Sequence, residues 1–316
     1  MDFIRNPNFN FIQWRWHAVA LSAVVLLAGI GYIAMRGVPL GIDFSGGTLI
    51  VVKFEQAVSE TAVRDALNAI PGDKVIQPYG DAGENEWLVR LPQVEAESAD
   101  LEGGGQAVLS ALEGANLGMF EVLQRDAVGP VIGRDLQLKG IYATLASLLG
   151  IAVYIGLRFR WSFAVGAIAA TLHDILVTLS FLAFFGYELS LNIVAAILAI
   201  AGYSVNDTIV IFDRIRENLR AKRRDPLQEV VNTSINQTLS RTIITSGTTT
   251  VAVLSLFLFG GEVLEGFAFA MLVGVLAGTY STVFIASSLA IVLSGKRAKG
   301  RATAASTPAS GGRKAS

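Results

Sequence analysis

The sequence contains no cysteine and only two histidines, His17 and His173, among 316 residues. Without cysteine the chain has no disulfides, no thiolate ligands for zinc or iron–sulfur clusters and no cysteine nucleophile. The H-E-x-x-H pattern of zinc proteases, the G-x-S-x-G pattern of serine hydrolases and a second aspartate in a protease dyad motif are also missing. We therefore expect a protein that is not an enzyme and has no cofactor.

Charged residues are scarce as well. They make up 16% of the chain, against roughly a quarter in ordinary soluble proteins, whereas hydrophobic residues make up 52%. The formal net charge is -1, so the chain as a whole has no electrostatic attraction to nucleic acid. This composition argues against a soluble globular enzyme and against a nucleic-acid-binding protein.

Long apolar runs explain the composition. A helix that spans a membrane needs about 20 mostly apolar residues. The first run is too long for the core of a signal peptide and ends without a cleavage site, which indicates an uncleaved signal anchor preceded by an interfacial Trp14 and Trp16. The fold class we expect is a polytopic α-helical membrane protein with one helix before and five after a small α+β domain. The six runs are 17–35, 139–158, 162–185, 190–212, 242–260 and 266–294.

The basic residues of the short connections predict the orientation. They gather in four places that alternate along the chain, so all four lie on the same side of the membrane, and the positive-inside rule makes that side cytoplasmic. Both termini are then cytoplasmic, and residues 37–137 lie on the opposite side of the membrane. The tail at 295–316 is basic, rich in small residues and expected to be disordered. The residues concerned are Arg5, Arg15, Arg158, Arg160, Arg214, Arg216, Arg220, Lys222, Arg223, Arg224, Arg241, Lys296, Arg297, Lys299 and Arg301.

Residues 37–137 form the polar domain, with 16 acidic and 6 basic residues and hence a net charge of -10. Strand-like runs occur at 48–54, 74–77, 86–91 and 120–124. Helical spacing occurs at 62–70 and, more weakly, around 108–112. The order β-α-β-β-α-β predicts a small ferredoxin-like sandwich.

Ionisable residues within the apolar runs are the first candidates for function, because a charge at mid-bilayer costs about 2.5 to 3.5 kcal/mol on insertion scales. Asp207 lies in the fourth run, Arg241 begins the fifth, and His173 and Asp174 lie in the middle of the third. Asp207 shares a helical face with Ala196 and Tyr203. The small residues Ala195, Ala199 and Gly202 lie close to this face, so we expect it to pack against other helices.

Asp207 and Arg241 fall at comparable depth, and we expect them to meet as an ion pair. Thr245 and Thr248 follow Arg241 at helical spacing and add hydroxyls that could bind water. One interpretation is a static salt bridge that fixes helix packing. The other is a proton-responsive pair, in which protonation of Asp207 releases Arg241. His173 and Asp174 either form structural hydrogen bonds or belong to a water path.

Five sequence motifs stand out. The longest and most specific is the run GYSVNDTIVIFDRIREN at 202–218, and the others are GIDFSGG at 41–47, VGP at 128–130, SINQTLSRT at 234–242 and TSGTT at 245–249. Together they resemble the SecF family, the small membrane subunit of the bacterial SecDF translocase accessory complex, which is related to the resistance-nodulation-division exporters. The resemblance covers about residues 10–294 and implies a bacterial inner membrane, with residues 37–137 periplasmic.

This resemblance implies partners and an energy source. SecF pairs with SecD in a pseudo-symmetric bundle of twelve helices, associates with the SecYEG channel, and has YidC as a further candidate partner. It uses the proton-motive force to help move an unfolded polypeptide that the motor SecA has pushed into the channel. The family's membrane aspartate and arginine match Asp207 and Arg241, which favours the proton-responsive interpretation, with Asn206 and Thr245 beside them.

Glycine motifs flank the polar domain. The run at 41–47 serves either a tight turn with close backbone approach or a direct contact with substrate. Asp43 is expected to cap or brace this linker. The motif at 128–130 mirrors the one at 41–47, and the two could form a paired hinge on which the polar domain tilts. Gly274 and Gly278 form a G-x-x-x-G pair for helix packing. The hinge residues are Gly41, Asp43, Gly46, Gly47, Gly129 and Pro130.

Two other functions stay open, and so does the role of one basic segment. The chain could be a membrane scaffold that recruits insertion factors and whose ion pair is purely structural. It could instead be a proton-driven exporter of small molecules, although such pumps carry both six-helix halves in one chain. The basic run at 214–224 is either a solvated face or a surface that docks anionic membrane lipids or cytoplasmic partners.

Overall fold

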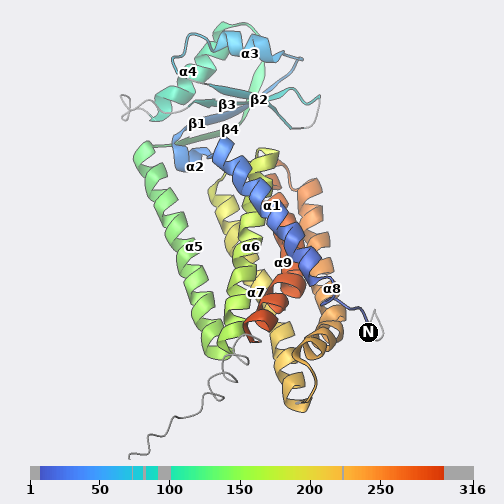
Figure 1. The fold of residues 1–316 in the computed structure, drawn as a ribbon. Coiled ribbons are helices and arrows are strands. Elements are labelled where there is room, and N and C mark those ends of the chain that lie inside the picture. The colour runs from blue at the N-terminus through green and yellow to red at the C-terminus, as the bar shows by residue number, and fades with distance from the viewer. Residues whose placement is uncertain (1–7, 73, 81–82, 92–100, 223, 295–316) are drawn as a thin grey trace, which may run out of the picture.

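The computed structural model describes residues 8–72, 74–80, 83–91, 101–222 and 224–294. A small sheet domain lies at one end of an elongated bundle of helices (Figure 1). The tail at 295–316, for which the sequence predicts disorder, lies outside the described residues.

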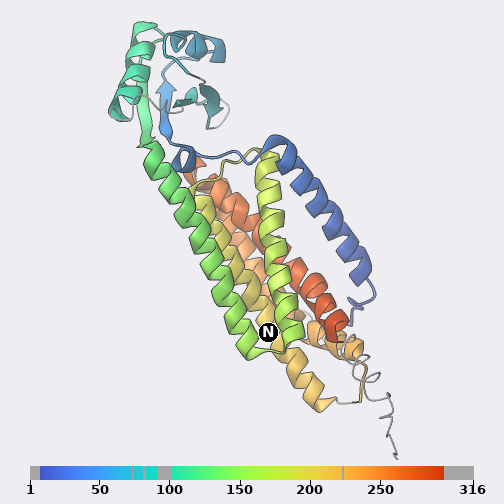
Figure 2. The ribbon, with the colours of Figure 1, turned by 60° about the vertical axis from the view of Figure 1, so that its left-hand side comes forward.

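Six helices are long and apolar enough to cross a membrane, as the sequence predicts. In the three central helices, α6, α7 and α9, about half of the residues in the most apolar stretch are buried inside the structure. In α1 and α5 only 6% of the residues in that stretch are buried. Helices α1 and α5 lie on opposite flanks of the bundle in Figure 2, and α1 crosses the front of the bundle in Figure 1. The helices are α1 (Arg15–Arg36), α5 (Pro130–Arg158), α6 (Trp161–Phe185), α7 (Leu191–Ala221), α8 (Leu227–Phe259) and α9 (Glu262–Ser281), which continues through a π-helical turn, η2 (Thr282–Ala286), to Ser294.

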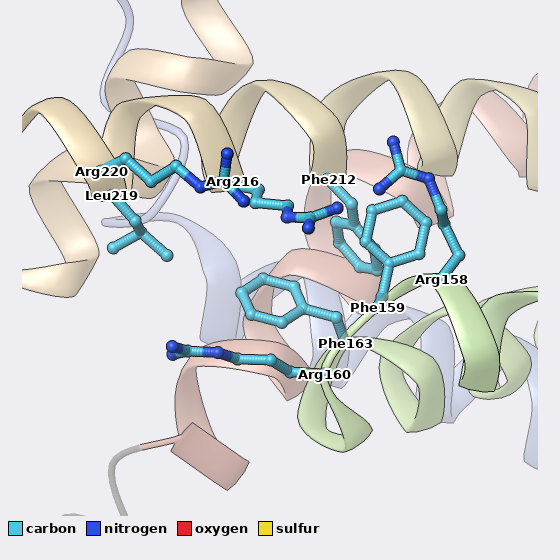
Figure 3. Close-up of a pocket in the computed structure, with 8 residues that line it drawn as sticks. All are labelled: Arg158, Phe159, Arg160, Phe163, Phe212, Arg216, Leu219 and Arg220. Carbon is cyan, nitrogen blue, oxygen red and sulfur yellow. The ribbon is translucent and has the colours of Figure 1, made fainter.

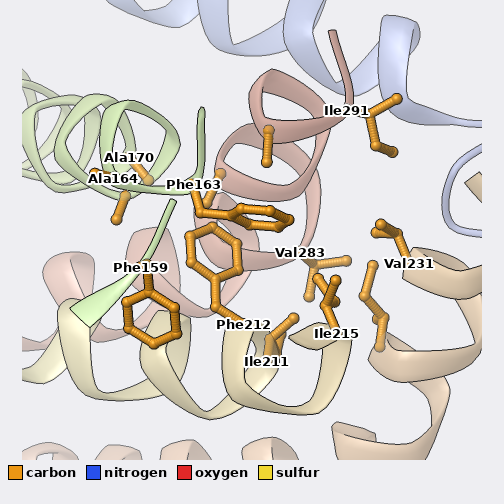
Figure 4. Close-up of a cluster of buried hydrophobic side chains, with 14 of the residues drawn as sticks. Phe159, Phe163, Ala164, Ala170, Ile211, Phe212, Ile215, Val231, Val283 and Ile291 are labelled. Atoms are coloured by element: carbon orange, nitrogen blue, oxygen red, sulfur yellow. The ribbon is translucent and has the colours of Figure 1, made fainter. Parts of the chain in front are cut away.

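Two of the expected boundaries are wrong. Helix α5 begins at Pro130, ahead of the apolar run, because proline is well suited to the first position of a helix. The expected connection between the fourth and fifth runs, 213–241, is largely helical. Its apolar residues keep helical spacing, and Ile215 of α7 and Val231 of α8 belong to one buried cluster (Figure 4).

The sheet domain has the predicted element order. Its four strands are all antiparallel in the order β2-β3-β1-β4, the arrangement of a ferredoxin-like sandwich. Helix α4 forms across three consecutive glycines, and a Cβ atom at Gly105 would lie 2.7 Å from the Arg125 side chain. The Arg125 side chain of β4 therefore lies directly against α4 at Gly105. The elements are β1 (Gly47–Phe54), α3 (Glu60–Ala66), β2 (Val75–Tyr79), β3 (Glu86–Leu91), α4 (Leu101–Gly114) and β4 (Phe120–Val128).

The core of this domain is apolar. Side chains of β1 and β3, such as Ile50 and Val89, are fully buried beneath Leu67 and Leu112, which pack from the two helices. A short helix, α2 (Ile42–Ser45), connects α1 to this sheet and packs against α5. The chain thus enters and leaves the sheet domain next to the same end of the bundle.

Candidate functional site

Asp207 lies buried between α7 and α8, with 4% of its surface exposed. Its Oδ2 atom accepts one hydrogen bond, from Ser246 Oγ at 3.3 Å. Ser246 Oγ in turn accepts from Tyr203 OH at 3.4 Å and lies 2.8 Å from Thr279 Oγ1 of α9. The fourth apolar run therefore places a carboxylate with few polar partners inside the bundle, as expected from the cost of exposing it to lipid.

The expected ion pair between Asp207 and Arg241 is absent. The ion pairs within 4.0 Å that the described residues form do not include one between them. The partner of Asp207 is Ser246, which lies five residues, or about 7.5 Å along the helix, beyond Arg241. Arg241 is exposed and lines a groove of about 880 Å³ between α7 and α8, where its charge acts on Asp207 through space.

Thr245 and Asn206, the two further neighbours predicted for Asp207, differ in whether they lie close to its carboxylate. Thr245 is close enough to interact with the carboxylate, but its hydroxyl donates to the main-chain carbonyls of Arg241 and Thr242. Asn206 is exposed and lies about 100° around α7 from Asp207.

The face of α7 that carries Ala196 and Asp207 is packed inside the bundle, as the sequence predicts. The small residues about one residue step away, Ala195, Ala199 and Gly202, are exposed.

His173 and Asp174 form a second buried polar cluster. His173 Nδ1 lies 3.0 Å from Asp174 Oδ1, and its Nε2 lies 3.0 Å from Ser22 Oγ of α1. Asp174 Oδ2 accepts hydrogen bonds from Ser204 Oγ at 2.5 Å and Ser281 Oγ at 2.8 Å. The cluster thus joins α1, α6, α7 and α9, and Asp174 has three partners where Asp207 has one.

The pair Gly274 and Gly278 lies against α7, in accordance with its spacing. A Cβ atom at Gly274 would lie 2.4 Å from the Ile200 side chain. A Cβ atom at Gly278 would lie 3.2 Å from Ser204 Cβ and 3.5 Å from Asp174 Oδ2. The glycines allow α9 to approach α7 closely enough to enclose Asp174.

The two glycine motifs contact each other at the base of the sheet domain. Gly46 and Gly47 have φ angles of 73° and 122°, which favour glycine. A Cβ atom at Gly46 would lie 3.1 Å from Pro130 Cα, next to Gly129. Gly41 N donates to the carbonyl of Leu189 at 2.9 Å, in the α6–α7 connection. Close backbone approach therefore accounts for these positions.

Asp43 braces this linker. Its Oδ2 atom accepts from the backbone N–H of Leu191, the first residue of α7, at 2.9 Å. A carboxylate at this position caps an otherwise unpaired donor and stabilises the positive end of the helix dipole. The linker is therefore attached to the helix that carries Asp207.

A second attachment joins residues far apart in the sequence. Arg90 Nη1 of β3 donates to Glu188 Oε2 at 2.5 Å and to the carbonyl of Leu40 at 3.0 Å. Burial raises the pKa of Glu188, and the attraction of Arg90 only partly opposes this effect. Next to it, burial and the neighbouring Glu265 raise the pKa of Tyr187 well above its usual range. No pattern pointed to Arg90, although Glu188 is the one charged residue of its short connection.

The arrangement suits proton uptake and helix coupling more than bond chemistry. Among the residues that the structure describes, no group of three His, Asp or Glu side chains could hold a metal ion. Asp174 of α6 is hydrogen-bonded to Ser204 of α7, which lies about one helical turn before Asp207 on the same helix.

Known proteins share this architecture. The family model "Protein export membrane protein SecD/SecF, C-terminal" matches residues 108–296, and "SecD/SecF GG Motif" matches residues 31–58. Protein translocase subunit SecF of Escherichia coli O157:H7 is 41% identical over 92% of this chain and 89% of its own. The SecF subunit of Desulfurispirillum indicum is 43% identical over 89% and 90%.

Solved structures agree. SecDF from Thermus thermophilus, described as a translocon-associated membrane protein, has a TM-score of 0.82 and 36% identity. The match covers 92% of this chain but 39% of that one. A second SecDF structure, in a super-membrane-facing form, has a TM-score of 0.71 over 96% of this chain and 41% of that one.

Proposed function

The chain belongs to the SecF family of protein translocase subunits and has a SecF-like role in protein export, and we propose that it couples the proton-motive force to that export through Asp207. The observation that carries the proposal is that this buried carboxylate has only hydroxyl groups as close polar neighbours among the described residues, Ser246 at 3.3 Å and the nearby Thr245. A carboxylate with so few partners in an apolar span is costly as an anion, so a proton from either side can change its charge with little rearrangement.

Protonation of Asp207 changes the charge that Arg241 experiences from the adjacent groove. This proton-dependent change is transmitted along α7 to the linker, because Asp43 is bound to the first residue of that helix. The sheet domain then moves on the paired glycine motifs. No catalytic step is involved, and the proton gradient takes the place of a cofactor.

The partners we propose are SecD, the SecYEG channel, the motor SecA and YidC, with an unfolded polypeptide as the cargo. The exposed stripe of Ala195, Ala199, Gly202 and Asn206 on α7 supports a partner helix on this face, because small and polar residues favour helix contacts over lipid. We further propose the bacterial inner membrane, with the sheet domain periplasmic and both termini cytoplasmic. The clustered arginines at the end remote from the sheet domain support this orientation.

Export into membrane vesicles that contain SecD, with and without a proton gradient, tests the proposal. One charge moved through 100 mV is worth about 2.3 kcal/mol, or about fifty-fold in an equilibrium. We therefore expect Asp207→Asn to abolish the increment in export that the gradient produces. Asp213→Asn is the matched control, because Asp213 lies further along the same helix, half-exposed and paired with Arg158, and it should keep the increment.

Co-purification with SecD distinguishes coupling from a scaffold. If Asp207→Asn binds SecD normally and loses only gradient-dependent export, coupling is supported. If it keeps that export at normal abundance, the coupling role is excluded. If assembly and export fall together, the scaffold is favoured. For Arg241→Lys, loss of export despite the retained charge would indicate that the guanidinium geometry matters.

A further inference from the structure

A basic cavity lies at the end of the bundle remote from the sheet domain. It has a volume of about 560 Å³, within the range of small-molecule sites, and opens between the α5–α6 turn and α7. Four arginines and three phenylalanines converge on it (Figure 3). The lining residues are Arg158, Phe159, Arg160, Phe163, Phe212, Arg216, Leu219 and Arg220.

The positive charge of this cavity is only partly neutralised within the chain. Arg158 donates to Asp213 Oδ1 at 2.9 Å. Arg160, Arg216 and Arg220 are exposed and form no ion pair within the part of the chain that the structure describes. Three guanidinium groups therefore stay available to an anion, and guanidinium is well matched to phosphate oxygens.

Aromatic rings form the floor. Phe163 and Phe212 pack edge to face with centroids 5.0 Å apart, and both belong to the large buried cluster of the bundle. Arg160 extends past the Phe163 ring from the start of α6, whereas Arg216 and Arg220 lie on the other side of the cavity, on α7 (Figure 3). The floor is fixed by the core, so the cavity offers both an apolar surface and a charged rim.

The position of the cavity favours a lipid over a soluble anion. Arg158 ends one membrane-spanning helix and Arg160 immediately precedes the next, which is the level of the lipid headgroups. Just inside that level, Leu157 and Trp161 are 86% and 70% exposed, so an acyl chain would find an apolar surface beside the arginines. A free phosphate or a nucleotide would make no use of these side chains.

We propose that this cavity binds the phosphate headgroup of an anionic phospholipid, whose acyl chains lie along the ends of α5 and α6. Arg160, Arg216 and Arg220 contact the phosphate, and Phe159 and Phe163 support the glycerol region. A lipid bound in this way joins the α5–α6 turn to the extension of α7 beyond Asp207.

Native mass spectrometry of the delipidated full-length chain, titrated with phosphatidylglycerol or phosphatidylcholine, tests this site. Each arginine near a lipid surface contributes about fivefold, so R160Q/R216Q/R220Q should weaken phosphatidylglycerol binding about a hundredfold and leave phosphatidylcholine binding unchanged. The triple lysine variant at the same positions keeps the charge and should bind within about tenfold of the original chain. Its recovery also shows that the sites tolerate substitution.

The matched control, R36Q/R134Q/K139Q, removes three charges at the opposite end of the spans and should leave phosphatidylglycerol binding unchanged. Equal loss in this control, or a glutamine triple variant that binds like the original chain, would overturn the proposal. Inorganic phosphate is the soluble probe. If it displaces the lipid at equal concentration, the site recognises a free anion and the lipid assignment is wrong.

Discussion

The sheet domain and the helix bundle differ in what they bury. Of the buried polar residues among the described ones, only Thr48 and Glu86 lie in the sheet domain, and all the others belong to the bundle. The core of the sheet domain is an apolar cluster under two short helices. The bundle also has an apolar cluster, but its centre contains two carboxylates, a histidine and many hydroxyls.

We infer from this difference that the sheet domain stays rigid, whereas the helix bundle responds to a change in protonation. The packing of an apolar core does not change with protonation. The sheet domain therefore moves as one rigid unit. The bundle contains one carboxylate with three partners and another with one. We infer that Asp174 stabilises the packing of the helices, whereas Asp207 is free to titrate.

Substitution of the two carboxylates gives the largest expected effects. Asp174→Leu leaves Ser204, Ser281 and His173 without an acceptor, and we expect a loss of about 3 to 5 kcal/mol in the free energy of unfolding. Asp207→Leu should be neutral or stabilising, because it removes an under-partnered carboxylate from an apolar site. Thermal unfolding of the purified variants measures both. Equal losses would contradict the distinction between the two residues.

A core substitution tests the rigidity of the sheet domain. Leu112→Ala creates a cavity under the sheet and should cost about 3 kcal/mol. Amide hydrogen exchange should increase in β1 and β3 and stay unchanged in α6 and α7, because the two cores are separate. Leu123→Ala, at a position that is 45% exposed, is the control and should cost less than about 0.5 kcal/mol. Faster exchange throughout the bundle would show that the two regions unfold together.

Helix packing around Asp174 gives a smaller effect. Gly274→Ala places a Cβ atom 2.4 Å from Ile200, and we expect a cost of about 2 kcal/mol in thermal unfolding. Ile200→Val in the same chain should recover part of it by removing one of the crowded atoms. Gly150→Ala on α5, where no atom lies within 4 Å, should instead be neutral or stabilising. If Ile200→Val recovers none of the stability lost in Gly274→Ala, the close approach of α9 to α7 is not the cause of that loss.

The same comparison explains what the sequence could predict. Periodicity and run length are local properties, so the six spans and the β-α-β-β-α-β order follow from them. The helical extension beyond 212 was missed because the apolar run stops there while the packed stripe continues to Ile215. The predicted contact between Asp207 and Arg241 failed because the apolar runs place residues along the helix only roughly, and the residue of α8 that meets Asp207 is Ser246, five residues beyond Arg241. Arg90 and Glu188 are 98 residues apart, and no local pattern joins them.

The contact between the sheet domain and the helix bundle, made by Arg90 and Glu188, gives the smallest expected effect and the clearest dependence on pH. The pKa of Glu188 is raised in the docked domain above its ordinary value of 4.5. The docked state therefore holds this proton more tightly than an undocked state, so docking is strongest below about pH 4.5 and weakens as pH rises through the raised pKa. Glu188→Gln should dock independently of pH. Arg90→Gln leaves a half-buried carboxylate unpaired and should weaken docking by about 1 kcal/mol at neutral pH.

Spin labels can measure this docking because the chain has no native cysteine. Labels at Glu113→Cys in α4 and Leu258→Cys in α8 would report the distance between the two regions. The distance distribution should narrow on acidification in the original chain and stay unchanged in Glu188→Gln. A distribution that broadens at low pH would show the opposite linkage, in which attraction by Arg90 outweighs burial and ionised Glu188 holds the domain. Protonation of Glu188 would then release the sheet domain, not secure it.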